Sequence, residues 1–112
     1  MKFNEQLAAT RANLDNLERL STVHPALFDT ATLISIEPEK AQVFLHASRE
    51  PNRDWKTFVQ QYPMAKWHRE SGVLSETWDY RGVLEGVNIC IIGAEKRPEA
   101  QPLFAEEGTV AA

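Results

Sequence analysis

The first apolar pattern along the chain has the period of a helix. Between Glu5 and Leu20 no glycine or proline interrupts a helix-compatible segment, and Asn4 is suited to cap its first turn. Because proline pushes the preceding residue out of the α region, His24-Pro25 should end the element. We therefore predict a helix over residues 4–22.

Apolar side chains on this predicted helix form a narrow seam. Phe3, Leu7, Leu14 and Leu17 follow alternating spacings of four and three residues once Thr10 is counted in the missing place. Such a seam either docks on the rest of the fold or pairs with a second copy of itself, although it is too short to indicate a coiled coil. Leu7, Leu14 and Leu17 are accordingly candidate partner-binding residues.

The next segments predict a β-hairpin and a second helix. Residues 31–37 and 41–48 read as strands around a Pro-Glu-Lys turn. Residues 51–62 read as a helix, which Asn52 or Asp54 can cap and the following proline ends. The apolar residues of that helix share one face: Trp55, Phe58, Val59 and Tyr62.

The remaining ordered pattern predicts a three-stranded meander over residues 65–70, 73–84 and 87–93. A two-residue Glu85-Gly86 turn pairs Leu84 with Val87, Gly82 with Ile89 and Tyr80 with Ile91. A two-residue Ser71-Gly72 turn pairs Leu74 with Arg69, Glu76 with Trp67 and Trp78 with Ala65.

The two registers agree on which side chains share a face. The face predicted to be buried carries Trp67, Leu74, Trp78, Tyr80, Leu84, Val87, Ile89 and Ile91. Gly82 should leave room on it, opposite Ile89, for an aromatic neighbour or a helix to approach closely. The opposite, polar face carries Lys66, His68, Ser75, Thr77, Asp79, Arg81, Asn88 and Cys90. The element order is thus α-β-β-α-β-β-β, an α+β fold in which helices cover one face of a mostly antiparallel sheet.

Composition places the chain among ordinary globular domains. Its 112 residues and 43% apolar content predict one domain over residues 1–94, followed by a loose tail over residues 95–112 that is rich in Pro, Ala and Glu. The start of the chain lacks the apolar stretch of a signal peptide, and no run is long enough for a membrane span. A single cysteine excludes an intrachain disulfide and suits a reducing compartment, so we expect a cytoplasmic protein.

Candidate chemistry gathers on the polar sheet face. His68, Asp79 and Arg81 lie there with Cys90, where a histidine and a carboxylate could activate a nucleophile, although alternation places polar residues on any solvated strand. A cysteine among isoleucines is typically an inert small hydrophobe. The spacing of the three histidines and the lone cysteine fits no metal site, and we expect no cofactor.

Two further functional readings remain open. His46-Ala47-Ser48 resembles one of the paired His-x-Ser motifs of two-histidine phosphoesterases, but the second copy is missing, since His68 is followed by Arg-Glu-Ser. A small hydrolase or transferase would use His46 or His68. Trp55, Lys66 and Arg69 could stack and neutralise a nucleic-acid single strand, against which the net charge of −4 argues.

The hairpin WDYRGVLEGVNI, from Trp78 to Ile89, resembles small uncharacterised proteins encoded by actinobacterial bacteriophages and prophages. In these a short helix leads into an aromatic-rich meander, and the likeness extends over residues 54–94. The resemblance implies a phage accessory protein that acts in the host cytoplasm on a host factor or a defence system, and it implies no active site. We therefore expect a non-enzymatic protein that binds an unidentified protein partner, with a homodimer through the first helix as one form of that binding.

Overall fold

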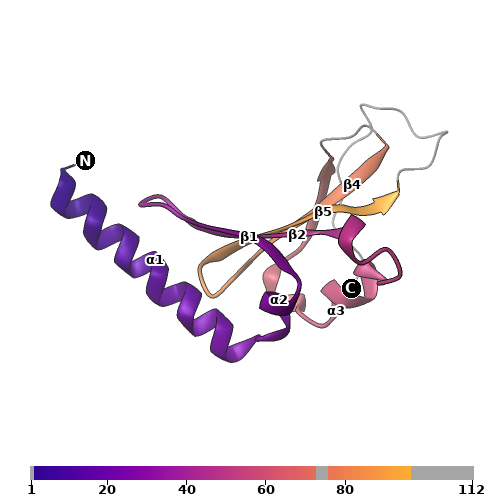
Figure 1. The fold of residues 1–112 in the computed structure, drawn as a ribbon, viewed down its shortest axis with the longest axis horizontal. Coiled ribbons are helices and arrows are strands. Elements are labelled where there is room, and N and C mark those ends of the chain that lie inside the picture. Colours follow the sequence, from indigo (N-terminus) through magenta and orange to yellow (C-terminus); the bar gives the residue numbers. More distant parts are fainter. Residues whose placement is uncertain (1, 73–75, 97–112) are drawn as a thin grey trace.

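The computed structural model describes residues 2–72 and 76–96 and shows three α-helices beside one five-stranded sheet (Figure 1). The helices are α1 (Phe3–Val23), α2 (Ala26–Asp29) and α3 (Trp55–Gln60), with short 3-10 turns η1 (Ala47–Arg49) and η2 (Pro63–Ala65). The strands are β1 (Ala31–Ile36), β2 (Ala41–His46), β3 (His68–Ser71), β4 (Thr77–Leu84) and β5 (Val87–Lys96). The predicted α+β class is confirmed, and the element order is confirmed apart from the short α2, which the sequence pattern did not indicate.

The sheet has the strand order β1-β2-β5-β4-β3. Every neighbouring pair is antiparallel except β2 and β5, which run parallel in the middle. These two strands carry fully buried side chains at alternate positions, including Val43 on β2 and Ile91 on β5. Placing them side by side within the sheet buries this apolar surface beneath the helices.

All three helices lie on one side of the sheet (Figure 1), which we call the inner face; the other side is the outer face. The core joins the inner face to the helices, as the periodicity of residues 51–62 predicted. Its largest fully buried members include Tyr80, Leu20, Leu27, Leu45 and Ile89. Of the side chains predicted on the buried face, Leu74 lies outside the described residues and all the others are buried.

The β4–β5 hairpin has the register expected from its turn. Leu84 pairs with Val87, Gly82 with Ile89 and Tyr80 with Ile91. Glu85 and Gly86 both have positive φ, 49° and 76°, as a two-residue turn of this kind requires. The room predicted beside Gly82 is filled by an aromatic ring: a Cβ added there would lie 2.9 Å from atoms of Trp67.

The predicted pairing of β3 with β4 is wrong by six residues. Arg69 pairs with Tyr80 rather than with Leu74, and Ser71 pairs with Trp78. The Ser71-Gly72 pair is not a two-residue turn, because the Gly72 amide bonds to the Thr77 carbonyl at 3.0 Å. A shift by an even number of residues keeps every side chain on its face. Trp67 is therefore still buried.

Two element boundaries also differ from the expectation. α1 begins one residue earlier than predicted, with Lys2 rather than Asn4 at the cap, and the Glu5 carboxylate accepts a bond from the Lys2 amide at 3.2 Å. α3 spans Trp55–Gln60 rather than the predicted residues 51–62. Its predicted cap Asp54 is confirmed, since its Oδ1 accepts from the Thr57 amide at 3.2 Å. Hydrogen bonds from Thr57 hold the pKa of the Asp54 carboxyl below its ordinary value.

The strand β5 continues into the segment that was expected to be tail. Glu95 belongs to β5, and its Oε2 accepts a hydrogen bond from the Tyr80 hydroxyl at 2.6 Å. Burial, and then the bond to this carboxylate, raises the pKa of Tyr80. The predicted boundary at residue 94 is therefore corrected for Glu95 and Lys96, and the rest of the predicted tail lies outside the described residues.

Candidate functional site

The helix α1 is attached to the sheet through its C-terminal half only. Leu17 is 8% exposed and Leu20 is fully buried in the core. Asn13 ties the middle of the helix to the β1–β2 turn, donating from Nδ2 to the Glu37 carbonyl at 2.6 Å and to the Pro38 carbonyl at 3.2 Å. We call residues 3–14 of α1 the arm, and its part before Asn13 extends past that turn (Figure 1).

The arm leaves much of the predicted seam uncovered. Phe3 is 73% exposed, and Leu7 and Leu14 are each 39% exposed. Leu17 stands one turn beyond Leu14, where the helix already lies over the sheet, and its burial in the chain's own core corrects its assignment as a partner-binding residue. The same apolar stripe thus serves the core at one end and faces solvent at the other.

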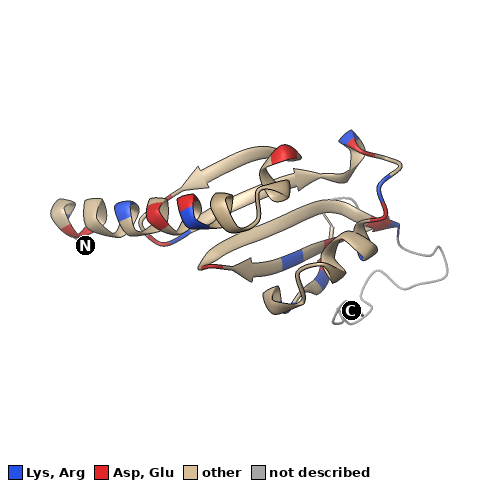
Figure 2. Cartoon of the chain, turned by 90° about the horizontal axis from the view of Figure 1, so that it is seen from below, with Lys and Arg blue, Asp and Glu red and all other residues tan. Residues whose placement is uncertain are grey.

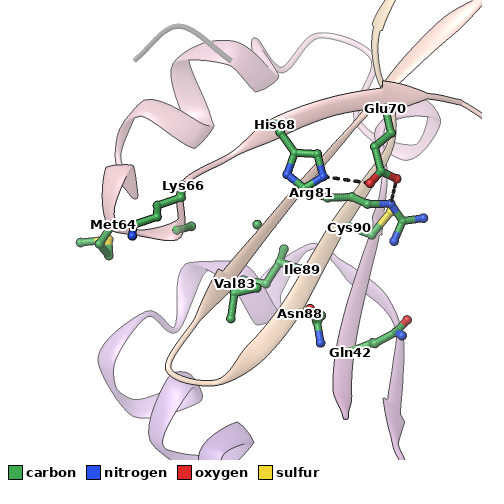
Figure 3. Close-up of a pocket in the computed structure, with 12 residues that line it drawn as sticks. Gln42, Met64, Lys66, His68, Glu70, Arg81, Val83, Asn88, Ile89 and Cys90 are labelled. Carbon is green, nitrogen blue, oxygen red and sulfur yellow. Dashed lines mark hydrogen bonds and ion pairs between the residues drawn. The ribbon is translucent and has the colours of Figure 1, made fainter. Parts of the chain in front are cut away.

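A second candidate site is a hollow of about 540 Å³ on the outer face (Figure 3). This volume lies within the range of ligand-binding clefts. Residues of the four adjacent strands β2, β5, β4 and β3 form it, together with residues in and next to the η2 turn. Both polar and apolar residues line it. They are Gln42, Met64, Ala65, Lys66, His68, Glu70, Arg81, Gly82, Val83, Asn88, Ile89 and Cys90.

The strand registers explain why these residues meet. One row across the outer face runs from Phe44 on β2 through Cys90 and Arg81 to His68 on β3. The neighbouring row carries Gln42, Asn88 and Val83 in the same way. His68 and Arg81 therefore lie on the polar face as expected, and they are cross-strand neighbours.

Glu70 is the centre of the charged groups in this hollow. Its Oε1 lies 2.8 Å from His68 Nε2, and its Oε2 forms an ion pair with Arg81 Nε (Figure 3). The carboxylate thereby holds the Nε side of the Arg81 guanidinium. The two terminal nitrogens form its free edge and point away from Glu70 (Figure 3). The Arg81 side chain keeps 43% of its surface exposed, so a ligand can reach this free edge.

The Cys90 thiol lies in the row beside Arg81 but is poorly suited to nucleophilic chemistry. It is only 4% exposed although it belongs to the outer face, where its cross-strand neighbours are Phe44 and Arg81. Burial raises the pKa of the thiol to about 11, against which the Arg81 charge acts only in part. Very little thiolate therefore exists near neutral pH.

Asp79 does not contribute to the exposed polar face, which corrects its predicted place beside His68 and Arg81. It is 3% exposed, and its Oδ1 accepts a hydrogen bond from the Gly93 amide at 2.8 Å. The β4–β5 register shifts at this point, and Gly93 has a φ of 70°. The carboxylate thus stabilises an irregularity in the sheet by satisfying a main-chain donor.

The two histidines proposed for catalysis lie in different hollows. His46 ends β2, where its Nδ1 contacts the Thr32 hydroxyl, and it lines a second hollow of about 340 Å³ together with Ser48. Two strands separate β2 from His68 on β3, a lateral distance of about 14 Å at ordinary strand spacing. The structure therefore does not bring His46 and His68 together.

The residues proposed for single-strand binding also do not share a surface. Trp55 is 4% exposed and packs in the core, whereas Lys66 is exposed at the rim of the outer-face hollow. The Arg69 guanidinium lies 5.1 Å from the Trp78 ring centroid and pairs with Glu95 at 3.5 Å. A stacking platform would need these three side chains side by side.

Sequence reasoning missed Glu70, Gln42 and Met64 as members of the hollow. Glu70 has the same strand parity as His68, so alternation alone could have placed it on that face. Gln42 required knowledge that β2 lies beside β5, and Met64 required the path of the η2 turn. Neither can be read from a local pattern.

Among residues 2–72 and 76–96, no group of three or more His, Cys, Asp and Glu side chains is arranged to hold a metal ion. In the same part of the chain, no helix combines the length and the apolar content needed to cross a membrane. Comparison with protein-family models, with curated proteins and with solved structures finds no match to the chain. Function must therefore be argued from the arm and the outer-face hollow themselves.

Proposed function

We propose that the protein is a non-enzymatic protein-binding module and that the arm of α1 is its binding element. The observation that carries this proposal is the exposed half of an apolar seam whose other half is core: Phe3, Leu7 and Leu14 remain accessible on a projecting helix. Amphipathic helices with spaced apolar anchors are a common means of protein recognition. The partner we propose is a second copy of the chain.

The seam suits pairing with itself. In an antiparallel alignment of two arms, Phe3 faces Leu14 of the other copy and Leu7 faces Thr10, over about 17 Å of helix. The flanking positions Asn4, Gln6, Arg11 and Asn13 bring a single charge per copy. Acidic and basic residues are interspersed along the rest of α1 (Figure 2), so no like-charged surface opposes a two-fold contact.

The expected affinity is low. The exposed parts of Phe3, Leu7 and Leu14 amount to roughly one and a half side chains per copy. Burying them in both copies contributes about 5 to 9 kcal/mol, at about 1.5 to 3 kcal/mol for each full side chain. Association costs about 4 kcal/mol or more, so at most about 5 kcal/mol remains and the dissociation constant should be no lower than about 0.2 mM. We therefore expect dimer to become visible between about 0.1 and 1 mM.

Sedimentation velocity over that concentration range tests the proposal. The apparent mass should rise from 12.7 kDa towards twice that value as concentration increases. Leu14→Glu and Leu7→Glu should both hold the chain at the monomer mass while the far-ultraviolet circular dichroism stays unchanged. A matched control is Leu33→Glu, because Leu33 is also exposed, at 56%, but lies on the edge strand β1.

A wild-type chain that stays at the monomer mass up to 1 mM would refute self-pairing through the arm. Loss of the folded circular dichroism signal in Leu14→Glu but not in Leu7→Glu would mean that Leu14 belongs to the core. An equal loss of dimer in Leu33→Glu would move the interface to the edge of the sheet.

The accessory role in a phage-infected host rests on the resemblance of the Trp78–Ile89 hairpin and is part of this proposal. A cytoplasmic location belongs to it as well, supported by the unpaired Cys90. Genes that neighbour the coding sequence would test both, since phage structural or lysis genes should surround it.

A further inference from the structure

The strand β3 is shorter than its neighbour β4 and leaves part of β4 without a strand partner on that side. β3 pairs with β4 from Trp78 to Arg81, whereas β4 continues to Leu84. Lys66 causes this difference, because its left-handed conformation, with φ of 54°, turns the chain away before a strand begins. Val83 therefore lies at an open edge of β4, and it lines the outer-face hollow.

The main-chain groups of Val83 point towards that open edge. In an antiparallel pair, successive residues direct their N–H and C=O groups alternately to one neighbouring strand and to the other. The Gly72 amide bonds to the Thr77 carbonyl at 3.0 Å, so Thr77, Asp79 and Arg81 direct these groups towards β3. By the same alternation Val83 directs its N–H and C=O to that side, where β3 has not begun.

Side chains around this edge provide two further kinds of contact. Met64 and Val83 are large apolar residues that are 58% and 50% exposed. Arg81 presents the free edge of its guanidinium two residues along β4, with its Nε held by Glu70 (Figure 3). Apart from His68, the charged residues of the hollow are Lys66, Arg81 and Glu70, which together carry one net positive charge.

We propose that this hollow binds a short extended peptide that carries a carboxylate. One peptide residue pairs its main chain with the N–H and C=O of Val83, as peptides do when they extend an open sheet edge. An apolar side chain of the peptide covers Met64 and Val83. The carboxylate binds the terminal nitrogens of Arg81, because a guanidinium held in place by a second carboxylate offers a planar donor edge that suits this group.

This site is independent of the arm of α1, and the two proposals can fail separately. Its test uses the full ¹⁵N-labelled chain and two pools of acetylated tetrapeptide amides built from Val, Thr, Ile and Ala. One pool has Glu fixed at one position, and the matched pool has Gln there. Two-dimensional ¹H–¹⁵N spectra follow the Val83 amide and the Arg81 Nε–H group, and sodium acetate is titrated separately as a carboxylate without a peptide.

We expect the Glu pool to shift both resonances and to bind about tenfold more tightly than the Gln pool, as a charge-assisted hydrogen bond at a partly exposed site should allow. Acetate should shift the Arg81 resonance and leave the Val83 amide unchanged. Arg81→Gln should lower the affinity of the Glu pool to that of the Gln pool. Arg49→Gln, which removes the same charge at an exposed position outside the hollow, should not.

Equal affinity of the two pools, or a Val83 amide unmoved by the Glu pool, would overturn the proposal. Shifts of Val83 with acetate as large as with the Glu pool would overturn the main-chain pairing. If Arg81→Gln loses the dispersed spectrum of a folded chain, the wild-type chain in 0.5 M NaCl replaces it. Salt should then weaken the Glu pool while the Gln pool is unaffected, and equal weakening of both pools would contradict a role for Arg81.

Discussion

Replacing Gly82 by alanine should destabilise the protein through a steric conflict beneath the sheet. A Cβ at this position would lie 2.9 Å from Trp67 Cδ2 and Cε3, and 3.0 Å from the Ala65 Cβ. These separations are shorter than carbon atoms tolerate in packed cores. The Trp67 ring cannot move freely, because it is 5% exposed and its Nε1 donates to the Tyr62 carbonyl at 2.9 Å.

The expected loss of stability is the difference between two effects. Extra volume in a packed core costs about 1 to 3 kcal/mol. Replacing glycine by alanine stabilises by about 0.4 to 1 kcal/mol, because it restricts the unfolded chain. Taking the middle of each range, about 2 and about 0.7 kcal/mol, we expect Gly82→Ala to lower the free energy of unfolding by about 1.3 kcal/mol. Urea denaturation followed by far-ultraviolet circular dichroism measures this change, with the dependence on urea concentration expected to stay the same.

A double-mutant cycle with Trp67→Phe separates the steric cause from a backbone effect. The smaller ring should relieve part of the conflict, so the cost of Gly82→Ala should fall by about 0.5 kcal/mol or more in that background. Gly93→Ala serves as the control. No atom lies within 4 Å of an added Cβ there, and its φ of 70° predicts a backbone cost of about 1 kcal/mol that Trp67→Phe leaves unchanged. An unchanged or increased stability of Gly82→Ala, or the same cost in both backgrounds, would refute the reasoning.

Two further predictions concern buried polar groups of the sheet. With a pKa of about 11, Cys90 in the folded chain should hold about 200-fold less thiolate at pH 8 than an unfolded thiol with a pKa of about 8.5, so a disulfide reagent such as DTNB should react slowly until urea is added. A rapid reaction with DTNB under native conditions would contradict the burial of Cys90. Because folding raises the pKa of the thiol, the contribution of protonated Cys90 to stability is complete below about pH 8.5 and is lost as the pH rises towards 11. Asp79→Ala should lower the free energy of unfolding by about 2 kcal/mol, because the Gly93 amide loses a charged acceptor, whereas Asp79→Asn should cost less since an amide oxygen can still accept. Equal urea midpoints for Asp79→Ala and the wild type would show that the Gly93 amide is satisfied without the carboxylate.

Local signals predicted the β4–β5 hairpin because its turn lies within two residues. Glu85 and Gly86 adopt the positive φ values that this turn needs, and the register follows from the turn without help from the rest of the chain. The apolar face of α3 was predicted for the same reason, since Trp55, Phe58 and Val59 lie one helical turn apart.

Local sequence signals predict only some of the residues that line the outer-face hollow. His68 and Arg81 were placed on one face by alternation, and they do share it. The contacts of Glu70 with His68 and Arg81 could not be predicted, because they depend on the β3–β4 register, and the predicted register is wrong by six residues. Alternation predicts that Asp79 lies on the exposed polar face, but the side chain is buried. The register shift near Gly93 places its carboxylate against the Gly93 amide.

The sequence by itself determined which side chains share a face, because the pleat of a strand and the turn of a helix are set by local backbone geometry. Only the tertiary structure decided which strands are neighbours, such as β2 beside β5, since that choice depends on contacts between residues far apart in the chain. It also decided that Leu17 is core while Leu7 is exposed, although both continue one seam. The pattern is the same at the two positions, and the difference is where the sheet ends beneath the helix.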